Sequence, residues 1–344
     1  MIHFSITTKL FKHSLWALLL CCATQLSAVK STRAQDDETI RTETALVQLN
    51  VGVVDRQGRT VTSLSRNDFV VYEDGVRQTI QSFEPTEAPF SLVMLLDMSG
   101  STSTFRPQLQ FAANRFLDAL GPDDRVSIIA FNARIKTLTG FTNNHSKLAY
   151  AIQIADGAGE THLYDALKQS LSALEKEGKR RRKAIVVLTD GIDTQVRNAD
   201  RPIVAKAQTD EEAIALLKPE ANPTLNEVLN EASRQGVTVY PLALPSGDPK
   251  RLPLPDPAII GMYSAAHTRL KVLAERTGGR LNEIYKLEEL AGLYAKVAAN
   301  LRALYTVAYQ APGQHARDGK WHEIRVEVTP PDLIASTRPG YFAK

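Results

Sequence analysis

Residues 91–101, SLVMLLDMSGS, decide how the rest of the chain is organised. An uninterrupted apolar run ends there in Asp97, which is the pattern of a parallel strand that is buried on both faces. Residues 184–190, AIVVLTD, repeat this pattern and end in Asp190. Because the carboxyl ends of parallel strands form the crevice where such sheets bind ligands, we expect the two aspartates to lie close together there.

Apolar strands and amphipathic helices alternate around these two runs. We expect further strands at 126–131 and 237–242, a short edge hairpin at 135–141, and helices at 105–120, 146–155, 163–177, 225–235, 267–277 and 286–303. Repeated strand–helix units predict a doubly wound, mostly parallel, Rossmann-like sheet with helices on both faces. Two stretches, 192–224 and 245–264, interrupt the alternation; they are rich in Pro, Asp and Lys and carry no recognisable site.

Both flanks of the α/β region show the alternating polar and apolar pattern of half-buried strands. The N-terminal segment, 45–84, has strands near 44–55, 69–75 and 78–83, and the C-terminal segment, 305–344, has strands near 305–309, 321–328 and 334–341. A block of three strands is marginally stable by itself. We therefore expect the two segments to pack together as one small β-sandwich, with an α/β domain at 90–303 inserted between them.

The first 34 residues have the three-part layout of a secretory signal peptide. A basic start is followed by an apolar run at 15–23, and Thr32-Arg33-Ala34 places small residues at −3 and −1 of a cleavage point. The run is short for a membrane span, which needs about 20 residues; an uncleaved N-terminal anchor is the alternative. We expect a secreted, periplasmic or cell-envelope protein in which residues 35–44 form a polar linker.

The charge balance argues against a nucleic-acid partner. The 344 residues are 43% hydrophobic and 23% charged, which is an ordinary globular composition. Four of the 41 basic residues and none of the 38 acidic ones lie in 1–34, so the rest of the chain has a net charge of −1. The basic run at 179–183 is expected to be a solvated connector. Both cysteines, Cys21 and Cys22, lie in the leader, so metal ligands of the mature chain would be oxygen or imidazole.

Three neutral hydroxyls accompany the two aspartates. Ser99 and Ser101 follow Asp97, and Thr161 lies in the loop that opens the helix at 163–177. Two carboxylates brought together repel each other unless a proton or a cation lies between them. An all-oxygen set of this kind suits Mg²⁺ or Mn²⁺ better than Zn²⁺. The alternative is structural, with Asp97 capping its own loop and Ser99 capping the next helix.

This pattern resembles the metal-ion-dependent adhesion site of the von Willebrand factor A family, which consists of Asp-x-Ser-x-Ser, a distant Thr and a distant Asp. The resemblance extends over about residues 90–300, and all five ligand positions are present, as Asp97, Ser99, Ser101, Thr161 and Asp190. The flanks at 68–75 and 338–341 are similar to those of bacterial secreted proteins with this domain. The resemblance implies that the hydroxyls touch the metal, while at least one aspartate acts through water or from behind the direct ligands.

The resemblance also implies an adhesion-type binding protein and not an enzyme. The metal would keep one coordination position open for a carboxylate of a protein partner. A hydrolase that uses the ion to activate water is one alternative, with Asp193, Glu160 and His162 as candidate general bases. Asp193 is also a candidate cap of the next turn. Another alternative is a structural envelope protein that binds through its β-sandwich.

Overall fold

The computed structural model describes residues 46–86, 88–178, 181–244, 256–284, 290–315 and 318–343. The chain divides into two units, Met1–Thr42 and Glu43–Lys344, and the described residues all belong to the second. The predicted signal peptide at 1–34 and linker at 35–44 lie outside the described residues, as does part of the stretch 245–264. In the described part of the chain, no helix combines the length and the apolar character that a membrane span requires.

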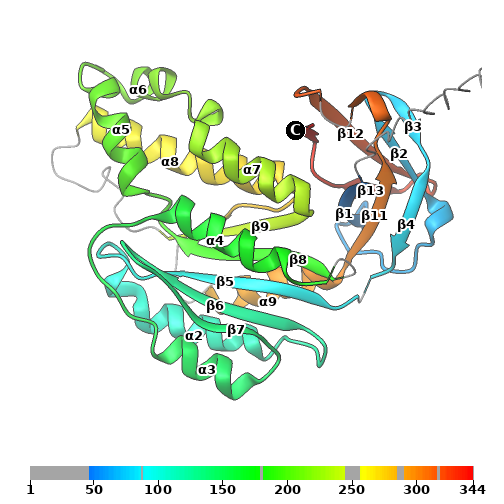
Figure 1. Cartoon of the computed structure of the whole chain (residues 1–344), viewed down its shortest axis with the longest axis horizontal. Coiled ribbons are helices and arrows are strands. Elements are labelled where there is room, and N and C mark those ends of the chain that lie inside the picture. Colours follow the sequence, from blue (N-terminus) through cyan, green and yellow to red (C-terminus); the bar gives the residue numbers. More distant parts are fainter. Residues whose placement is uncertain are drawn as a thin grey trace, which may run out of the picture. The chain divides into compact units, whose positions relative to one another are not determined.

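Six strands form the central sheet, in the order β10-β9-β8-β5-β6-β7 (Figure 1). They are β5 (Phe90–Asp97), β6 (Arg125–Phe131), β7 (Ile135–Thr142), β8 (Arg182–Thr189), β9 (Val237–Ala243) and β10 (Asn282–Glu283). Neighbouring strands are parallel except β6 and β7, which are antiparallel. The prediction of a separate hairpin at 135–141 is wrong: this stretch is the single edge strand β7, because β6 supplies its antiparallel partner.

Helices cover both faces of the central sheet (Figure 1). One face is covered by α2 (Arg106–Leu117), α3 (His145–Gln153) and α9 (Leu290–Arg302), and the other by α4 (Leu163–Glu175), α7 (Pro223–Gln235) and α8 (Pro257–Arg276). Successive side chains of β5 enter different cores, with Met94 on the first side and Val93 on the second. The predicted doubly wound α/β fold is therefore confirmed.

The two stretches that interrupt the predicted alternation are largely helical where they are described. The first contains α5 (Thr194–Val204), α6 (Asp210–Leu217) and a 3₁₀ turn at Pro219–Ala221. In the second, α8 begins at Pro257, well before the expected start at 267, because the Asp256 side chain accepts a hydrogen bond from the Ala258 N–H and proline suits the first helical position. A small core of Val204, Ala213, Leu217 and Ala265 joins the three helices.

Strands from both ends of the chain form two further four-stranded sheets, ordered β13-β1-β11-β4 and β14-β12-β2-β3. They are β1 (Leu46–Asp55), β2 (Phe69–Glu73), β3 (Val76–Gln78), β4 (Ile80–Glu84), β11 (Leu304–Gln310), β12 (Trp321–Val328), β13 (Leu333–Ser336) and β14 (Gly340–Phe342). N-terminal β1 pairs with C-terminal β11, and β2 pairs with β12. Both sheets contribute to one core, for example through Leu49, Val71, Tyr305 and Val326. The small β-sandwich with an α/β insertion, expected as part of the fold class, is thus present.

One predicted strand of the tail is divided. The stretch 334–341 forms β13 and β14, which lie in different sheets. Pro339, between them, has no N–H to donate to a ladder, and the Thr337 hydroxyl donates to the Asn50 carbonyl at 2.8 Å. The prediction of a continuous strand there is therefore wrong.

Candidate metal-binding site

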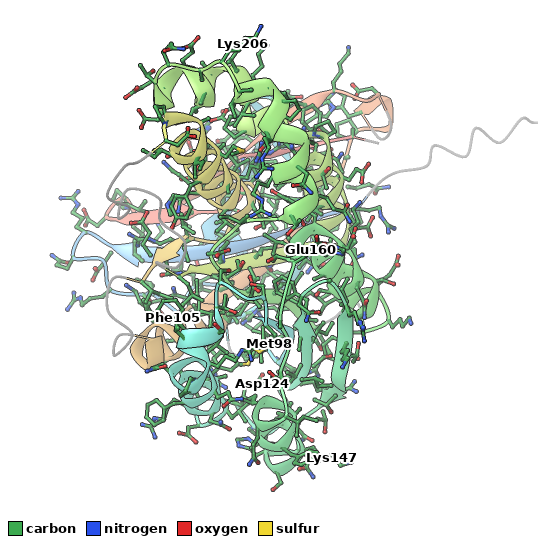
Figure 2. All side chains as sticks on the ribbon, turned by 90° about the vertical axis from the view of Figure 1, so that its left-hand side faces the viewer. Met98, Phe105, Asp124, Lys147, Glu160 and Lys206 are labelled. Carbon is green, nitrogen blue, oxygen red and sulfur yellow. The ribbon has the colours of Figure 1, made fainter. Side chains whose placement is uncertain are left out.

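The predicted site lies where the order of the strands reverses. From β5 the chain moves outward to β6 and β7, and then crosses to β8 on the other side of β5. Open α/β sheets bind ligands at the carboxyl ends of the strands beside such a reversal. Asp97 ends β5 and Asp190 follows β8, so the two aspartates flank it. Figure 2 looks onto this side, with Met98 and Glu160, the sequence neighbours of Asp97 and Thr161, near its middle.

The Asp97 carboxylate is buried, and each of its oxygens accepts a hydrogen bond. Oδ1 accepts from the Ser99 backbone N–H at 2.9 Å, and Oδ2 accepts from the Thr189 hydroxyl at 2.7 Å. Asp97 therefore caps its own loop, as the structural alternative expects, and also contacts the end of β8. Burial and the neighbouring Asp190 raise the pKa of Asp97 to about 7. Without a cation, the pair of carboxylates thus retains a proton up to near-neutral pH.

The Ser99 and Ser101 hydroxyl oxygens lie 3.2 Å apart. Two adjacent ligands of an octahedral Mg²⁺, each about 2.1 Å from the ion, are about 3.0 Å apart, so the hydroxyls suit neighbouring positions. Thr102, which sequence analysis missed, shapes this loop by donating from its hydroxyl to the carbonyls of Asp97 and Ser99 at 2.8 and 3.1 Å. The 3₁₀ turn Ser103–Phe105 has Thr102 at its N-cap, so the alternative in which Ser99 caps the next helix is wrong.

Close contacts on two sides hold the loop that carries Thr161. The Thr161 N–H donates to the Thr194 hydroxyl at 3.0 Å, and its carbonyl accepts from the Thr194 N–H at 2.8 Å. On the other side, a β-carbon at Gly157 would lie 2.7 Å from the Met98 carbonyl oxygen and 2.6 Å from Nδ2 of Asn132. Glycine at this position therefore lets the Thr161 loop approach the loop that follows β5.

A cavity of about 450 Å³ opens at the site, and its lining includes Ser101, Thr161 and Asp190. The opposite wall comes from α5 and α8, through the residues Val196, Arg197, Ile259, Met262 and Arg269. The two stretches to which sequence analysis assigned no role therefore border the cavity.

The three candidate general bases differ in their surroundings. Asp193 is the N-cap of α5, in agreement with the capping role proposed for it from the sequence. Its Oδ1 accepts hydrogen bonds from two backbone N–H groups of that helix, and its Oδ2 accepts one from the Tyr164 N–H at 3.2 Å. Glu160 lines the cavity, but its side chain is 64% exposed. His162 lies 3.7 Å from Glu160 and is not among the described residues that line the cavity.

The residues at this edge fit a hard divalent cation. Asp97 and Asp190 are only 0% and 3% exposed, and two buried carboxylates in close proximity are stabilised when a positive charge lies between them. The hydroxyls of Ser99, Ser101 and Thr161 add neutral oxygens, which Mg²⁺ and Mn²⁺ accept as ligands.

Comparison with known proteins identifies the class of this domain. Residues 92–192 match the family model of the von Willebrand factor type A domain. The match covers 101 of the 344 residues, so this part of the chain is similar to that domain, which is typically a protein-interaction or adhesion module.

The individual proteins that are similar to this chain share either a short region or a low sequence identity with it. An uncharacterized protein of Synechocystis is 33% identical over 106 residues, which are 30% of this chain and a quarter (25%) of that relative. A von Willebrand factor type A structure from Catenulispora acidiphila shows 14% identity over 82% of this chain and 65% of that one, with a TM-score of 0.46. The von Willebrand factor domain of the type V pili tip protein Mfa5 from Porphyromonas gingivalis shows 15% identity over 63% of this chain and 96% of that one, with a TM-score of 0.45.

Proposed function

We propose that this chain is an exported, adhesion-type protein-binding module that captures an acidic group of a protein partner through a bound Mg²⁺ or Mn²⁺. The observation that carries the proposal is the pair of buried carboxylates, Asp97 and Asp190, next to paired serine hydroxyls at the mouth of a cavity. Such an arrangement is costly for folding unless a cation compensates the charges, and it is therefore typical of a binding site.

The contacts suggest roles for four of the five residues. The hydroxyls of Ser99, Ser101 and Thr161 would be direct ligands. Asp97 already accepts hydrogen bonds on both carboxylate oxygens, so we assign it to orienting the serine loop and to binding the ion through water. The metal, when bound, supplies a positive charge with an open coordination position. With two negative charges in the site, a dication is formally neutralised but still attracts one more carboxylate oxygen.

The cavity wall supports an acidic partner. Arg197, an exposed residue of α5, adds a positive charge to the cavity that Ser101, Thr161 and Asp190 also line. Ile259 and Met262 on α8 contribute apolar surface at the same wall. A partner side chain such as Asp or Glu, flanked by apolar residues, would suit both features. We place this binding outside the cytoplasm, on the strength of the predicted signal peptide at 1–34.

A pull-down from a cell-envelope extract tests the proposal. Immobilised wild-type chain is incubated with the extract in Mg²⁺ and, separately, in chelator, alongside Asp97→Ala and a control, Asp118→Ala. The control removes an exposed aspartate at the end of α2, where the side chain is 62% exposed. We expect the wild type and the control to retain the same partner in Mg²⁺, and chelator or Asp97→Ala to abolish retention. Retention by Asp97→Ala in chelator would place the binding surface elsewhere, for example on the β-sandwich.

A further inference from the structure

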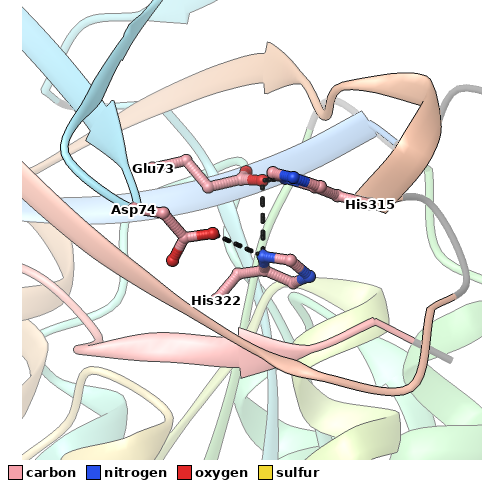
Figure 3. Close-up of side chains that lie close together, drawn as sticks. All are labelled: Glu73, Asp74, His315 and His322. Carbon is pink, nitrogen blue, oxygen red and sulfur yellow. Dashed lines mark hydrogen bonds and ion pairs between the residues drawn. The ribbon is translucent and has the colours of Figure 1, made fainter.

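A second cluster of titratable side chains lies in the β-sandwich. Glu73, Asp74, His315 and His322 each bring one potential ligand atom to within 4.8 Å of those of the others (Figure 3). We propose that these four side chains bind a transition-metal dication, and that Zn²⁺ is the ion that suits them best. This site is separate from the five residues at the edge of the central sheet and does not depend on the function proposed for them.

The distances within the cluster suit a tetrahedral ion. Four nitrogen and oxygen ligands at about 2.0–2.1 Å from Zn²⁺ lie about 3.3 Å from one another. The Glu73 Oε1 atom is 2.7 Å from His315 Nδ1 and 3.9 Å from His322 Nδ1, and His322 Nδ1 is 2.7 Å from Asp74 Oδ2. These separations bracket the expected value, so small side-chain rotations suffice to admit the ion.

The turn between β2 and β3 explains how two adjacent carboxylates reach one point. Successive residues of a strand point to opposite faces, but Asp74 has a φ of 50° and Gly75 a φ of 78°, as in a two-residue hairpin turn of type I′. The Asp74 N–H also donates to the Glu323 carbonyl at 3.0 Å, and its Oδ1 accepts from the Glu323 N–H at 2.9 Å. The turn is thus fixed against β12, which carries His322.

Contacts behind the cluster orient its ligand atoms. His322 Nε2 lies 3.1 Å from Asp318 Oδ1. A metal-binding histidine commonly donates its second N–H to a carboxylate in this way, which leaves the other nitrogen free to bind the metal. The hydroxyls of Tyr309 and Tyr341 donate to Oε2 of Glu73 at 2.5 and 3.3 Å, while its other oxygen, Oε1, faces the two imidazoles.

The charges and the burial of the cluster also favour a cation. Glu73 is 1% exposed and His322 is 3% exposed, and a buried carboxylate needs a compensating positive charge. Two carboxylates neutralise a dication, and two neutral imidazoles make the set softer than the hydroxyl and carboxylate set of the sheet edge. The side chains of Asp74 and His315 are 38% and 22% exposed, so an ion can enter from solvent.

The site would fasten the two ends of the sandwich to each other. Glu73 and His315 are 242 positions apart in the sequence. The chain's two cysteines, Cys21 and Cys22, both precede the described residues, so a disulfide between these segments is not available. A bound metal would supply that cross-link, because it holds residues of the N-terminal segment and of the C-terminal segment in one coordination sphere.

The test is metal titration of the full chain after removal of bound metal with a chelator and dialysis. Calorimetry follows Zn²⁺ binding, and Co²⁺, whose visible absorption reports tetrahedral coordination, serves as the spectroscopic probe. We expect one site that Mg²⁺ in excess does not compete for and that Asp97→Ala leaves unchanged. His315→Ala should weaken Zn²⁺ binding by at least about 100-fold. Asp318→Asn removes the charge that faces His322 Nε2 but keeps an oxygen that can accept from the Lys320 N–H, and it should weaken binding by about 10–100-fold.

His315 and Asp318 are chosen because both side chains are partly exposed, whereas replacement of the buried His322 also endangers folding. The matched control is His267→Ala, which removes a histidine whose Nε2 is 2.8 Å from Glu283 outside the cluster. It should bind Zn²⁺ like the wild type. Saturable binding that is equal in wild type, His315→Ala and Asp318→Asn would overturn the proposal. So would the absence of saturable Zn²⁺ binding, in which case the cluster is an ion-pair network held together by protons.

Discussion

The Thr189 hydroxyl donates a 2.7 Å hydrogen bond to Oδ2 of Asp97, and it joins the ends of two parallel strands whose residues are 92 positions apart. The same hydroxyl accepts a hydrogen bond from the Gly191 N–H at 3.0 Å. Thr189 therefore links the Asp97 carboxylate to the loop that carries Asp190. This contact holds the two carboxylates in place before any ion is bound.

Replacing Thr189 by valine should weaken metal binding, although Thr189 is not itself a proposed ligand. The change removes a donor that favours the charged form of Asp97, so the metal must compete with a more tightly held proton. We expect about a 10-fold loss of Mn²⁺ affinity at pH 7 and a loss of about 1–3 kcal/mol in the free energy of unfolding. Calorimetry and chemical denaturation measure the two effects. Thr189→Ser keeps the hydroxyl and should bind Mn²⁺ nearly as tightly as the wild type. An equal loss of Mn²⁺ affinity in Thr189→Ser and Thr189→Val would contradict the account.

The stability of the metal-free protein should depend on the charge of Asp97. Its pKa in the folded state, about 7, lies above the ordinary 3.8 because of burial and the neighbouring Asp190. The folded state thus binds the proton more tightly, so the free energy of unfolding should fall as the pH rises from about 4 to about 7 and then level off with respect to this group. In chelator, the free energy of unfolding of Asp97→Asn should not show the part of this decrease that comes from Asp97. In the wild type, added Mg²⁺ should compensate the decrease. Urea denaturation across this pH range provides the measurement; parallel curves for the two proteins would refute the assignment.

The core of the β-sandwich should be far more sensitive to truncation than its edge. Leu49 on β1 is 0% exposed, whereas Leu46 on the same strand is 59% exposed. Leu49→Ala should lower the free energy of unfolding by about 2–5 kcal/mol, and Leu46→Ala should change it by no more than about 0.5 kcal/mol. Thermal and chemical denaturation compare the two. Equal effects would mean that β1 does not pack in the shared core.

A buried ion pair supports the cavity wall. Arg269 on α8 contacts Asp200 on α5 at 2.7 and 3.1 Å, and the side chains are 3% and 7% exposed. Arg269→Leu leaves a buried aspartate without its partner and should destabilise the protein by about 3–5 kcal/mol, part of which Asp200→Leu in the same chain should restore. Lys168→Ala, which breaks the exposed pair with Glu227, should cost no more than about 1 kcal/mol. If the double variant Arg269→Leu/Asp200→Leu is less stable than Arg269→Leu alone, the cost of Arg269→Leu does not come from leaving Asp200 unpaired, and this prediction is contradicted.

The sheet and its edge could be predicted because their signals are local. The apolar run of β5 and the Asp-x-Ser-x-Ser sequence after it occupy one continuous stretch, and the topology of a parallel sheet then requires Asp97 and Asp190 to meet. The helices α5 and α6 were missed, because α5 is rich in polar residues and contains Pro202, and α6 is only 8 residues long. Val204, Ala213 and Leu217 of these helices face a small satellite core, and Val196 of α5 joins the core beside the sheet. Little of either helix packs on the sheet, so the predicted strand–helix alternation does not require them.

The cluster around Glu73 could not be predicted for a different reason. Its histidines, His315 and His322, are scattered in the sequence, and no spacing between them and Glu73 indicates a metal site. His322 meets Glu73 through the pairing of β2 with β12, in which Glu73 lies opposite Ile324, and His315 reaches Glu73 from the 3₁₀ turn Gly313–His315 that follows β11. That register depends on how two strands from opposite ends of the chain pack, which a pattern of alternating residues does not specify.

The central claim is that Asp97 belongs to a site for Mg²⁺ or Mn²⁺, and calorimetric titration of either ion into wild type and Asp97→Ala tests it most directly. To keep the sandwich cluster out of the measurement, both proteins carry His315→Ala. We predict that one ion binds saturably to the protein that retains Asp97. At an ion concentration of 100 times the dissociation constant, the free energy of unfolding of this protein should increase by about 2.7 kcal/mol. We predict no saturable binding to Asp97→Ala, whose unfolding remains cooperative. Equal binding to both proteins would contradict the assignment of the metal to this site, and the proposed metal-dependent capture of an acidic partner with it.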